Sequence, residues 1–364
     1  MAFLQSAWAL PAAGIGVGCL MGFFARRHHF CTMSALERFW FANDANGLRS
    51  WVLAGAIALA ATQILVSTGL ADVKQSFYLI EPLHLAGAIL GGLAFGVGMA
   101  LVGTCGFGAI VRLGGGNLRA LVVLTGIGLS AIAAQRGITG HFRVAFLDPL
   151  SFTFPGGDGQ SLAAPFNAFT GMDMTAPLGL LISAILFWWV FRNANFRKDQ
   201  GKIIAGAAIG LSIAAGWVIT SFYARVLFQP VQVEAGSFVM PVGDTIMQII
   251  TVTGVIPDYG VGLVIGVSFG AAFAAWKADD IRWEACDDAR ELGRHLLGAF
   301  LMGTGGVYAL GCTIGEGVSA FSVLAATAPI AILSIVLGAR IGLGFLIEGS
   351  PLGFLLPLGL SRKN

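Results

Sequence analysis

Nine long apolar runs divide this chain, and they restrict its fold more than any other feature. A helix needs about 20 mainly apolar residues to cross a hydrocarbon core of about 30 Å. The runs lie at approximately 8–25, 50–70, 83–103, 117–135, 174–191, 202–221, 259–276, 294–311 and 318–343. Only 11% of the 364 residues are charged, against roughly 25% in soluble domains. The sequence therefore predicts an all-α polytopic membrane protein with about nine transmembrane helices, in one transmembrane domain over 1–364.

Lysine and arginine are unevenly distributed between the segments that connect these runs. If the N-terminus faces outside, seventeen of the 21 cationic residues lie on the inner side, as the positive-inside rule requires. The outer side then holds only Lys74, Arg136, Arg143 and Arg225. We therefore expect a multi-pass protein with its N-terminus outside and its C-terminus inside. No charged region precedes the first run, so that run predicts a membrane helix and not a signal peptide.

The charge balance and the motifs exclude several function classes. The formal net charge is +2, with no basic arm or patch, which gives no support for nucleic-acid binding. No Ser/His/Asp arrangement or phosphate-binding motif is present, and the cysteines lack metal-ligand spacing. The sequence therefore predicts no enzyme activity, no cofactor and no metal site.

One glycine-rich stretch around Cys105 recurs around Cys312. The matched pairs are Gly91 with Gly298, Gly96 with Gly303, Gly98 with Gly305, Cys105 with Cys312, and Gly108 with Gly315. Because chance would give roughly one or two matches in a window of this composition, the pattern indicates an internal repeat. The predicted topology makes the run before Cys105 cross inward and the run before Cys312 cross outward. The two cysteine loops would then enter from opposite faces, as in the inverted repeats of secondary transporters.

This inverted repeat predicts two halves, at approximately 1–140 and 174–343, joined by an outer loop at 136–173. Because that loop contains several prolines and glycines, we expect it to lack regular secondary structure. Two apolar segments are too short or too broken to span the membrane, Val242–Val255 and Phe345–Leu360. The first is expected to lie in the interface, re-enter partway or form a lid helix, and the second to be a half-inserted tail.

Three of the five cysteines stand in polar or glycine-rich breaks at helix ends. They are Cys31, Cys105 and Cys312. A single buried cysteine is ordinarily a small hydrophobic residue, but the repeat favours a function for Cys105 and Cys312. The other two, Cys19 and Cys286, are expected to be a packing residue and a solvated loop thiol.

The glycines beside these thiols are expected to leave their backbone N–H groups exposed. They are Gly106, Gly108, Gly311 and Gly315. Without side chains, their N–H groups would face a substrate, and a helix that begins there would favour an anion. The glycines at Gly91, Gly96 and Gly98 are expected to permit close helix packing instead.

Two charged residues near the cysteine loops have competing interpretations. Arg112 is expected to anchor the inner face, with guidance of an anion as the alternative. Glu316 is expected to face water at the outer mouth, with pairing to a cation as the alternative, because an unsolvated charge in a membrane is costly.

At the three cysteine loops the sequence resembles the YeeE/YedE family of sulfur-compound permeases, which includes bacterial thiosulfate importers. The resemblance lies in RRHHFCTMSALERF, LVGTCGFGAIVRLGGGNLRALVVL and LGCTIGEG. It implies an hourglass-shaped carrier of the bacterial inner membrane, in which cysteines of partly inserted loops touch the substrate. By motif match these cysteines are Cys31, Cys105 and Cys312. The resemblance also implies a small cytoplasmic sulfur carrier of the TusA type as a partner, beside the membrane lipid.

Three functional hypotheses follow. The first is import of thiosulfate or a related sulfur anion through a relay of neutral thiols. The second is a membrane thiol-disulfide protein that transfers electrons through Cys105 and Cys312, although paired-cysteine motifs are absent. The third is a soft-metal channel that uses thiolates, for which few additional soft ligands are present.

Overall fold

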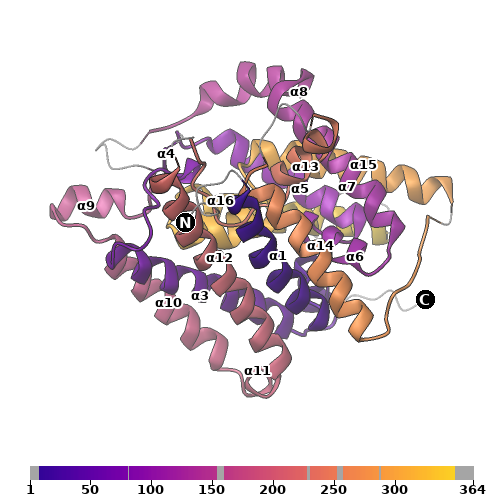
Figure 1. Cartoon of the computed structure of the whole chain (residues 1–364), viewed down its shortest axis with the longest axis horizontal. Helices are drawn as coiled ribbons and strands as arrows, with labels where there is room; N and C mark the ends of the chain where they lie inside the picture. The colour runs from indigo at the N-terminus through magenta and orange to yellow at the C-terminus, as the bar shows by residue number, and fades with distance from the viewer. Residues whose placement is uncertain are drawn as a thin grey trace.

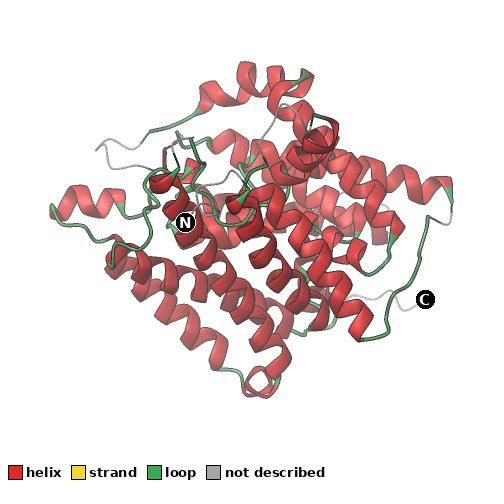
Figure 2. Ribbon diagram, in the orientation of Figure 1, coloured by secondary structure: helices red, strands yellow, loops and turns green. Residues whose placement is uncertain are grey.

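The computed structural model describes residues 8–80, 82–153, 160–227, 230–251, 257–286 and 288–348. Within these ranges the regular structure is helical and no strand forms (Figure 2). The long helices are α1 (Ala9–Arg27), α3 (Asn46–Ser67), α5 (Leu85–Val102), α7 (Leu118–Arg136), α10 (Thr175–Phe191), α12 (Gln200–Val226), α14 (Tyr259–Lys277), α15 (Ala289–Tyr308) and α16 (Thr327–Glu348). A long helix therefore overlaps each of the nine predicted apolar runs.

Shorter helical segments connect these helices. They are α2 (Thr32–Phe41), α4 (Phe77–Ile80), α6 (Gly106–Gly114), α8 (Ile138–Phe142), the π-helix η2 (Arg143–Leu147), the 3-10 helix η3 (Asp148–Leu150), α9 (Ala164–Thr170), α11 (Ala194–Lys198), α13 (Met240–Ile250) and the π-helix η4 (Gly315–Ala320).

Seven stretches of the described chain are long and apolar enough to cross a membrane. They are Ala9–Phe41, Asn46–Ser67, Leu85–Gly114, Leu118–Arg136, Gln200–Val226, Tyr259–Lys277 and Thr327–Ile347. Two predicted spans fall outside this set: α10 has only 17 residues, and α15 carries Arg290, Glu291 and Arg294 in its first two turns. The protein is an all-α polytopic membrane protein, as the sequence predicts.

Two of these spans are broken where a cysteine stands. The first is interrupted between α1 and α2, where His29 adopts a φ of 53°. The second is interrupted between α5 and α6, because α5 ends at Gly103 with a left-handed φ of 75°. Glycine adopts that conformation without the steric cost of a Cβ. Discontinuous helices of this kind form the binding sites of secondary transporters.

The two helices that precede the repeated cysteines pack directly against each other and run antiparallel. A Cβ on Gly91 would lie 2.6 Å from the Gly305 carbonyl oxygen, and one on Gly98 would lie 2.5 Å from that of Gly298. An early residue of α5 therefore meets a late residue of α15, and a later residue meets an earlier one. The repeat is inverted, and its glycines permit close backbone approach, as predicted.

The helices that follow the cysteines exchange partners between the repeats. Helix α16, which follows the Cys312 loop, packs on α5, while α7, which follows the Cys105 loop, packs on α15. Each repeat thus completes the packing of the other. Figure 1 shows α5, α7 and α15 together on one side of the molecule. The limits of the two halves, 1–140 and 174–343, stay a prediction.

Helices α1 and α14 lie side by side near the middle of the view in Figure 1. Glycines line their contact: a Cβ on Gly18 would lie 2.8 Å from the Val267 nitrogen, and one on Gly266 would lie 2.8 Å from the Ile15 Cα. Because neither backbone is shielded by a side chain there, the two helices approach closely.

The segments predicted to leave the membrane are more regular than expected. The described part of the 136–173 segment contains α8, η2, η3 and α9, so its predicted irregularity is wrong there. Residues 154–159, which hold most of the prolines and glycines behind that prediction, lie outside the described residues. Helix α13 occupies the start of Val242–Val255 and packs on α7 and α14, with Ile249 and Ile250 exposed. Residues 252–256 and 349–364 lie outside the described residues. The C-terminal parts of the two predicted short apolar segments, Val242–Val255 and Phe345–Leu360, are therefore not described.

Candidate functional site

All three predicted cysteines stand directly before a short helix. Cys31 is the N-cap of α2, and Cys105 is the N-cap of α6. Cys312 comes immediately before a helical segment at 313–322, whose centre is η4. Helix N-termini carry a partial positive charge and unpaired N–H groups. Each thiol therefore lies where a helix end favours an anion.

The two repeated sulfur atoms have the same hydrogen-bond geometry. The Gly108 N–H donates to the Cys105 Sγ at 3.4 Å, and the Gly315 N–H donates to the Cys312 Sγ at 3.4 Å. Both N–H groups are bonded to the sulfur atoms. They are therefore not free to face a substrate here, in contrast to the prediction. The Cys105 thiol in turn donates its S–H proton to the Thr32 hydroxyl at 4.0 Å, so this sulfur both accepts and donates a hydrogen bond.

Cys105 is the central thiol of the three. Its Sγ lies 4.0 Å from the Thr32 hydroxyl, and the Thr313 hydroxyl faces it from the other repeat. The Cys105 sulfur also interacts electrostatically with Cys31 and with Cys312. Cys105 therefore lies near both of the other thiols.

Sequence reasoning missed both threonines at this centre. Thr32 follows Cys31, and Thr313 follows Cys312, so the Cys-Thr pair recurs at two of the three loops. This recurrence was the sequence signal that could have drawn attention to the two threonines. It does not indicate that both hydroxyls lie toward Cys105.

The two inner thiols are closed off from solvent. Cys105 is 1% exposed and Cys312 is 0% exposed. Beside them the rings of Phe107 and Phe238 pack with centroids 4.8 Å apart, and both side chains are buried. This arrangement is therefore a closed one, in which a solute reaches neither sulfur without movement of the surrounding residues.

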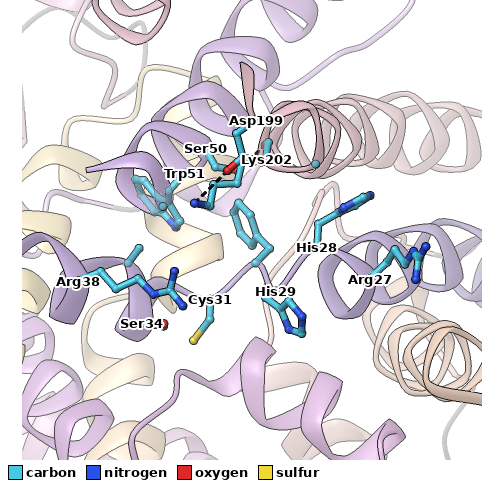
Figure 3. Close-up of a pocket in the computed structure, with 14 residues that line it drawn as sticks. Arg27, His28, His29, Cys31, Ser34, Arg38, Ser50, Trp51, Asp199 and Lys202 are labelled. Carbon is cyan, nitrogen blue, oxygen red and sulfur yellow. Dashed lines mark hydrogen bonds and ion pairs between the residues drawn. The ribbon is translucent and has the colours of Figure 1, made fainter. Parts of the chain in front are cut away.

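A cavity of about 320 Å³ opens at the half-buried Cys31 (Figure 3). We call it the basic vestibule, and its charged or thiol-bearing lining is Arg27, His28, His29, Cys31, Arg38, Asp199 and Lys202. The Lys202 ammonium pairs with Asp199 at 3.1 Å, as the dashed line in Figure 3 marks. Cations outnumber the single carboxylate, so the vestibule is suited to an anion.

A second cavity, of about 230 Å³, contains Glu234, Asp244 and Asp258 together with Arg136 and Ser237. We call it the acidic pocket. Burial, with Asp258 and Asp244 nearby, raises the pKa of Glu234 to about 8. Burial and Asp258 raise the pKa of Asp244 to about 6, and burial raises the pKa of Asp258. Near neutral pH the pocket therefore carries less negative charge than three ionised carboxylates would give it.

The two cavities lie at opposite ends of α12. Lys202 in the basic vestibule belongs to the first turn of this helix, and Glu234 in the acidic pocket follows its last turn at Val226. The chain after α12 folds back along this helix, and the Thr220 hydroxyl donates to the Glu234 carbonyl at 2.7 Å. Lys202 and Thr220 are eighteen residues apart in α12, which corresponds to about 27 Å of helix. The cavities are therefore separated by roughly the thickness of a bilayer.

Glu316 is fully buried, which contradicts the expectation that it faces water at the outer mouth. Its side chain belongs to η4 and is 0% exposed. The reason is that η4 folds inward and packs on α3, α12 and α16. No local pattern distinguishes this from a loop that stays in solvent.

The predicted glycines lie beside polar groups of neighbouring residues. A Cβ on Gly106 would lie 3.7 Å from the Phe238 carbonyl oxygen, and one on Gly311 would lie 3.3 Å from the Glu316 Oε1. Gly108 lies directly against the Thr104 hydroxyl. These contacts connect the backbone at Cys105 and Cys312 to polar neighbours, and whether any of them contacts a substrate stays a prediction.

Arg112 is anchored by a backbone contact. Its guanidinium donates to the Gly103 carbonyl at 2.9 Å, where α5 ends. A cation there compensates the unpaired carbonyls of a helix C-terminus. The contact fixes the guanidinium at the end of α5, and whether Arg112 anchors the inner membrane face stays a prediction.

The five cysteines are free in this structure. Cys19 lies within α1, with its backbone carbonyl against Gly270 of α14, and Cys286 is partly exposed. Over the described ranges, no three His, Cys, Asp or Glu side chains form a group that would hold a metal ion.

Known proteins are similar in sequence to this chain over most of its length. Residues 27–341 match the family described as sulphur transport. The thiosulfate transporter TsuA of Spirochaeta thermophila is 25% identical over 353 residues, which cover 89% of this chain and 96% of that protein. The thiosulfate transporter TsuA of Escherichia coli K12 is 22% identical over 331 residues, covering 85% and 87%. All three cysteine breaks lie inside the matched residues, and the chain belongs to the sulphur-transport family of membrane proteins.

Proposed function

We propose that this protein is an inner-membrane permease that imports thiosulfate or a related sulfur anion without covalent change. One observation carries the proposal. Cys312, Cys105 and Cys31 stand at the N-termini of three short helical segments, and Cys105 lies near each of the other two thiols. The names of the two relatives, both thiosulfate transporters, support this choice of substrate.

The chemistry of the thiols suits transient binding of such an anion. A neutral thiol is a weak S–H donor that costs little to bury. It offers a hydrogen bond to the terminal sulfur or an oxygen of thiosulfate, while a thiolate would repel the dianion. Conduction requires sites that bind well enough to be entered and weakly enough to be left. A series of thiols meets that requirement better than a series of arginines.

The proposed path runs from the acidic pocket to the basic vestibule. Ser237 connects the acidic pocket to the Cys312 loop, because a Cβ on Gly315 would lie 3.2 Å from the Ser237 hydroxyl oxygen. Cys31 connects the Cys105 centre to the basic vestibule. Since Cys105 and Cys312 are buried, passage requires the inverted halves to move relative to each other.

The positive-inside orientation makes the basic vestibule the cytoplasmic exit. Released anion would accumulate there among Arg27, Arg38 and Lys202. A small acceptor of the TusA type, which the sequence resemblance implies, would meet the substrate at this face. Its binding is testable by co-purification with the wild-type protein and with a variant in which Arg27 and Arg38 are changed to Gln.

Import of a dianion also has an energetic requirement. Moving charge against an inside-negative potential costs about 2.3 kcal/mol per elementary charge per 100 mV, or about 4.6 kcal/mol for a dianion. Binding groups along the path cannot offset this difference between the two compartments, because they act equally in both directions. Accumulation therefore requires an energy source, which is either a co-transported cation or consumption of the anion inside the cell.

Uptake by purified protein in proteoliposomes tests the function. We expect labelled thiosulfate to enter faster than in protein-free vesicles, and unlabelled thiosulfate to compete better than sulfate, sulfite or selenite. Cys19→Ala, a thiol outside the proposed path, is the matched control and should retain uptake. Uptake no faster than in protein-free vesicles, or equal competition by all four anions, would contradict the proposed substrate.

A further inference from the structure

Glu316 is a buried carboxyl group without a partner. Its side chain is 0% exposed, and neither carboxyl oxygen has a hydrogen bond or an ion pair in the described part of the chain. An ionised carboxylate in such a place is very costly, whereas a protonated one is tolerated. It lies in η4, a π-helix, and π-helical turns occur frequently at functional sites.

The groups around Glu316 contain no compensating cation among the described residues. Helices α3, α12 and α16 pack against η4. The Thr327 hydroxyl of α16 faces the carboxyl outside hydrogen-bond geometry, and Trp51 of α3 lies against Gly317. The titratable groups nearby are the Tyr78 phenol and the Cys312 thiol. These two are neutral near neutral pH, so a proton is the charge that would neutralise Glu316.

Tyr78 connects Glu316 to the acidic pocket. This phenol lies near both Glu316 and Glu234. A Cβ on Gly315 would lie 3.1 Å from the Tyr78 hydroxyl oxygen and 3.2 Å from that of Ser237. The Tyr78 hydroxyl is buried and has no hydrogen-bond partner among the described residues. A proton that enters the acidic pocket therefore has a hydroxyl available between Glu234 and Glu316.

We propose that Glu316 is a proton-binding residue that carries one proton inward with each anion that passes the Cys312 loop. This inference rests on the proposed import of a sulfur dianion. Glu316 accepts the hydroxyl proton of Tyr78, Tyr78 regains a proton from the acidic pocket, and Glu316 then gives its proton to water on the inner side, so that one O–H bond breaks for each one that forms. No electrons are exchanged. The net charge that crosses falls from two negative charges to one, which lowers the electrical work of uptake.

The ratio of protons to thiosulfate tests the proposal. Proteoliposomes containing an enclosed pH dye receive labelled thiosulfate, and both fluxes are measured for wild type, Glu316→Gln and Glu284→Gln. Glutamine keeps the shape of the buried side chain and cannot titrate. Glu284 is an exposed residue of the same type, so its variant is the control. We expect Glu316→Gln to transport one proton fewer per anion, and Glu284→Gln to match wild type.

Thiosulfate exchange across the membrane without a pH gradient separates the proton step from anion passage. We expect Glu316→Gln to retain exchange within a factor of about two of wild type, since its proton step is lost and its thiols remain. An unchanged proton ratio in Glu316→Gln would overturn the proposal, as would wild-type thiosulfate uptake without proton uptake. Absence of any wild-type thiosulfate transport would instead overturn the proposed function and this inference with it.

A second variant keeps the proposal testable if Glu316→Gln does not fold. Tyr78→Phe removes only the hydroxyl between Glu234 and Glu316. We expect slower thiosulfate-dependent proton uptake, with exchange of labelled for unlabelled thiosulfate retained. Proton uptake as fast as in wild type would overturn the assigned route and, with a misfolded Glu316→Gln, the proposal.

Discussion

The Cys312 sulfur accepts a hydrogen bond from the Gly315 backbone N–H at 3.4 Å. The same arrangement joins Cys105 to Gly108, also at 3.4 Å. An alanine at either cysteine position would leave the glycine N–H without its acceptor and would remove the S–H donor. These two thiols are therefore the groups on which the proposed relay most depends.

Removal of either thiol should strongly reduce uptake. A hydrogen bond to a charged group contributes about 1.5–3 kcal/mol, and each 1.4 kcal/mol corresponds to a factor of ten. We expect Cys105→Ala and Cys312→Ala each to lower the initial rate of thiosulfate uptake by about tenfold or more, at equal membrane expression. Near-wild-type uptake in both variants would refute the relay.

The state of the thiols distinguishes permeation from electron transfer. A non-reducing gel after alkylation with a mass-tagging reagent reports whether Cys105 and Cys312 cross-link. Permeation predicts that both remain free before and after addition of thiosulfate, as they are in this structure. A disulfide that forms and disappears with the redox state of the buffer would support the thiol-disulfide hypothesis instead.

The close glycine contact between the repeats should be sensitive to a single methyl group. A Cβ on Gly305 would lie 2.5 Å from the Gly91 carbonyl oxygen, whereas one on Gly293 of the same helix meets nothing within 4 Å. We expect Gly305→Ala to destabilise the protein by roughly 1–3 kcal/mol through overpacking. Gly293→Ala should be neutral or stabilising by up to about 1 kcal/mol. Thermal unfolding in detergent measures both, and equal effects would contradict the antiparallel packing.

The acidic pocket should make stability depend on pH. Burial raises the pKa of Glu234 to about 8, so the folded state binds this proton more tightly than the unfolded state. The resulting stability is complete below the ordinary glutamate pKa and is lost as the pH rises through about 8. Because the pKa of Asp244 is about 6, the range from about pH 6.5 to about pH 8 isolates Glu234 best.

We therefore expect the thermal midpoint of wild type to fall over this range and that of Glu234→Gln to fall less. Asp173→Asn, which removes an exposed carboxylate in the segment before α10, is the control and should follow wild type. A midpoint that rises with pH in wild type, or identical slopes in wild type and Glu234→Gln, would show that Glu234 is not protonated in the folded protein.

The sequence alone determined the helices and the places where they break. Membrane insertion depends on the apolarity of consecutive residues, which is a local property and can be counted along the chain. The repeat of Cys105 and Cys312 was visible for a similar reason, because glycine and cysteine stood at matching intervals. The resemblance to a family of sulfur-compound permeases rested on those same motifs, and the match over residues 27–341 confirms it.

Only the tertiary structure decided which groups meet inside the bilayer. Thr32 and Thr313 lie far apart in the sequence but face Cys105 from two different helices. Glu316 was expected in water and is buried, because α3, α12 and α16 close over η4. Such contacts depend on how inverted helices pack across hundreds of residues. No local periodicity records that packing, so the burial of Glu316 and the contacts of Cys105 with the two threonines became apparent only from the folded chain.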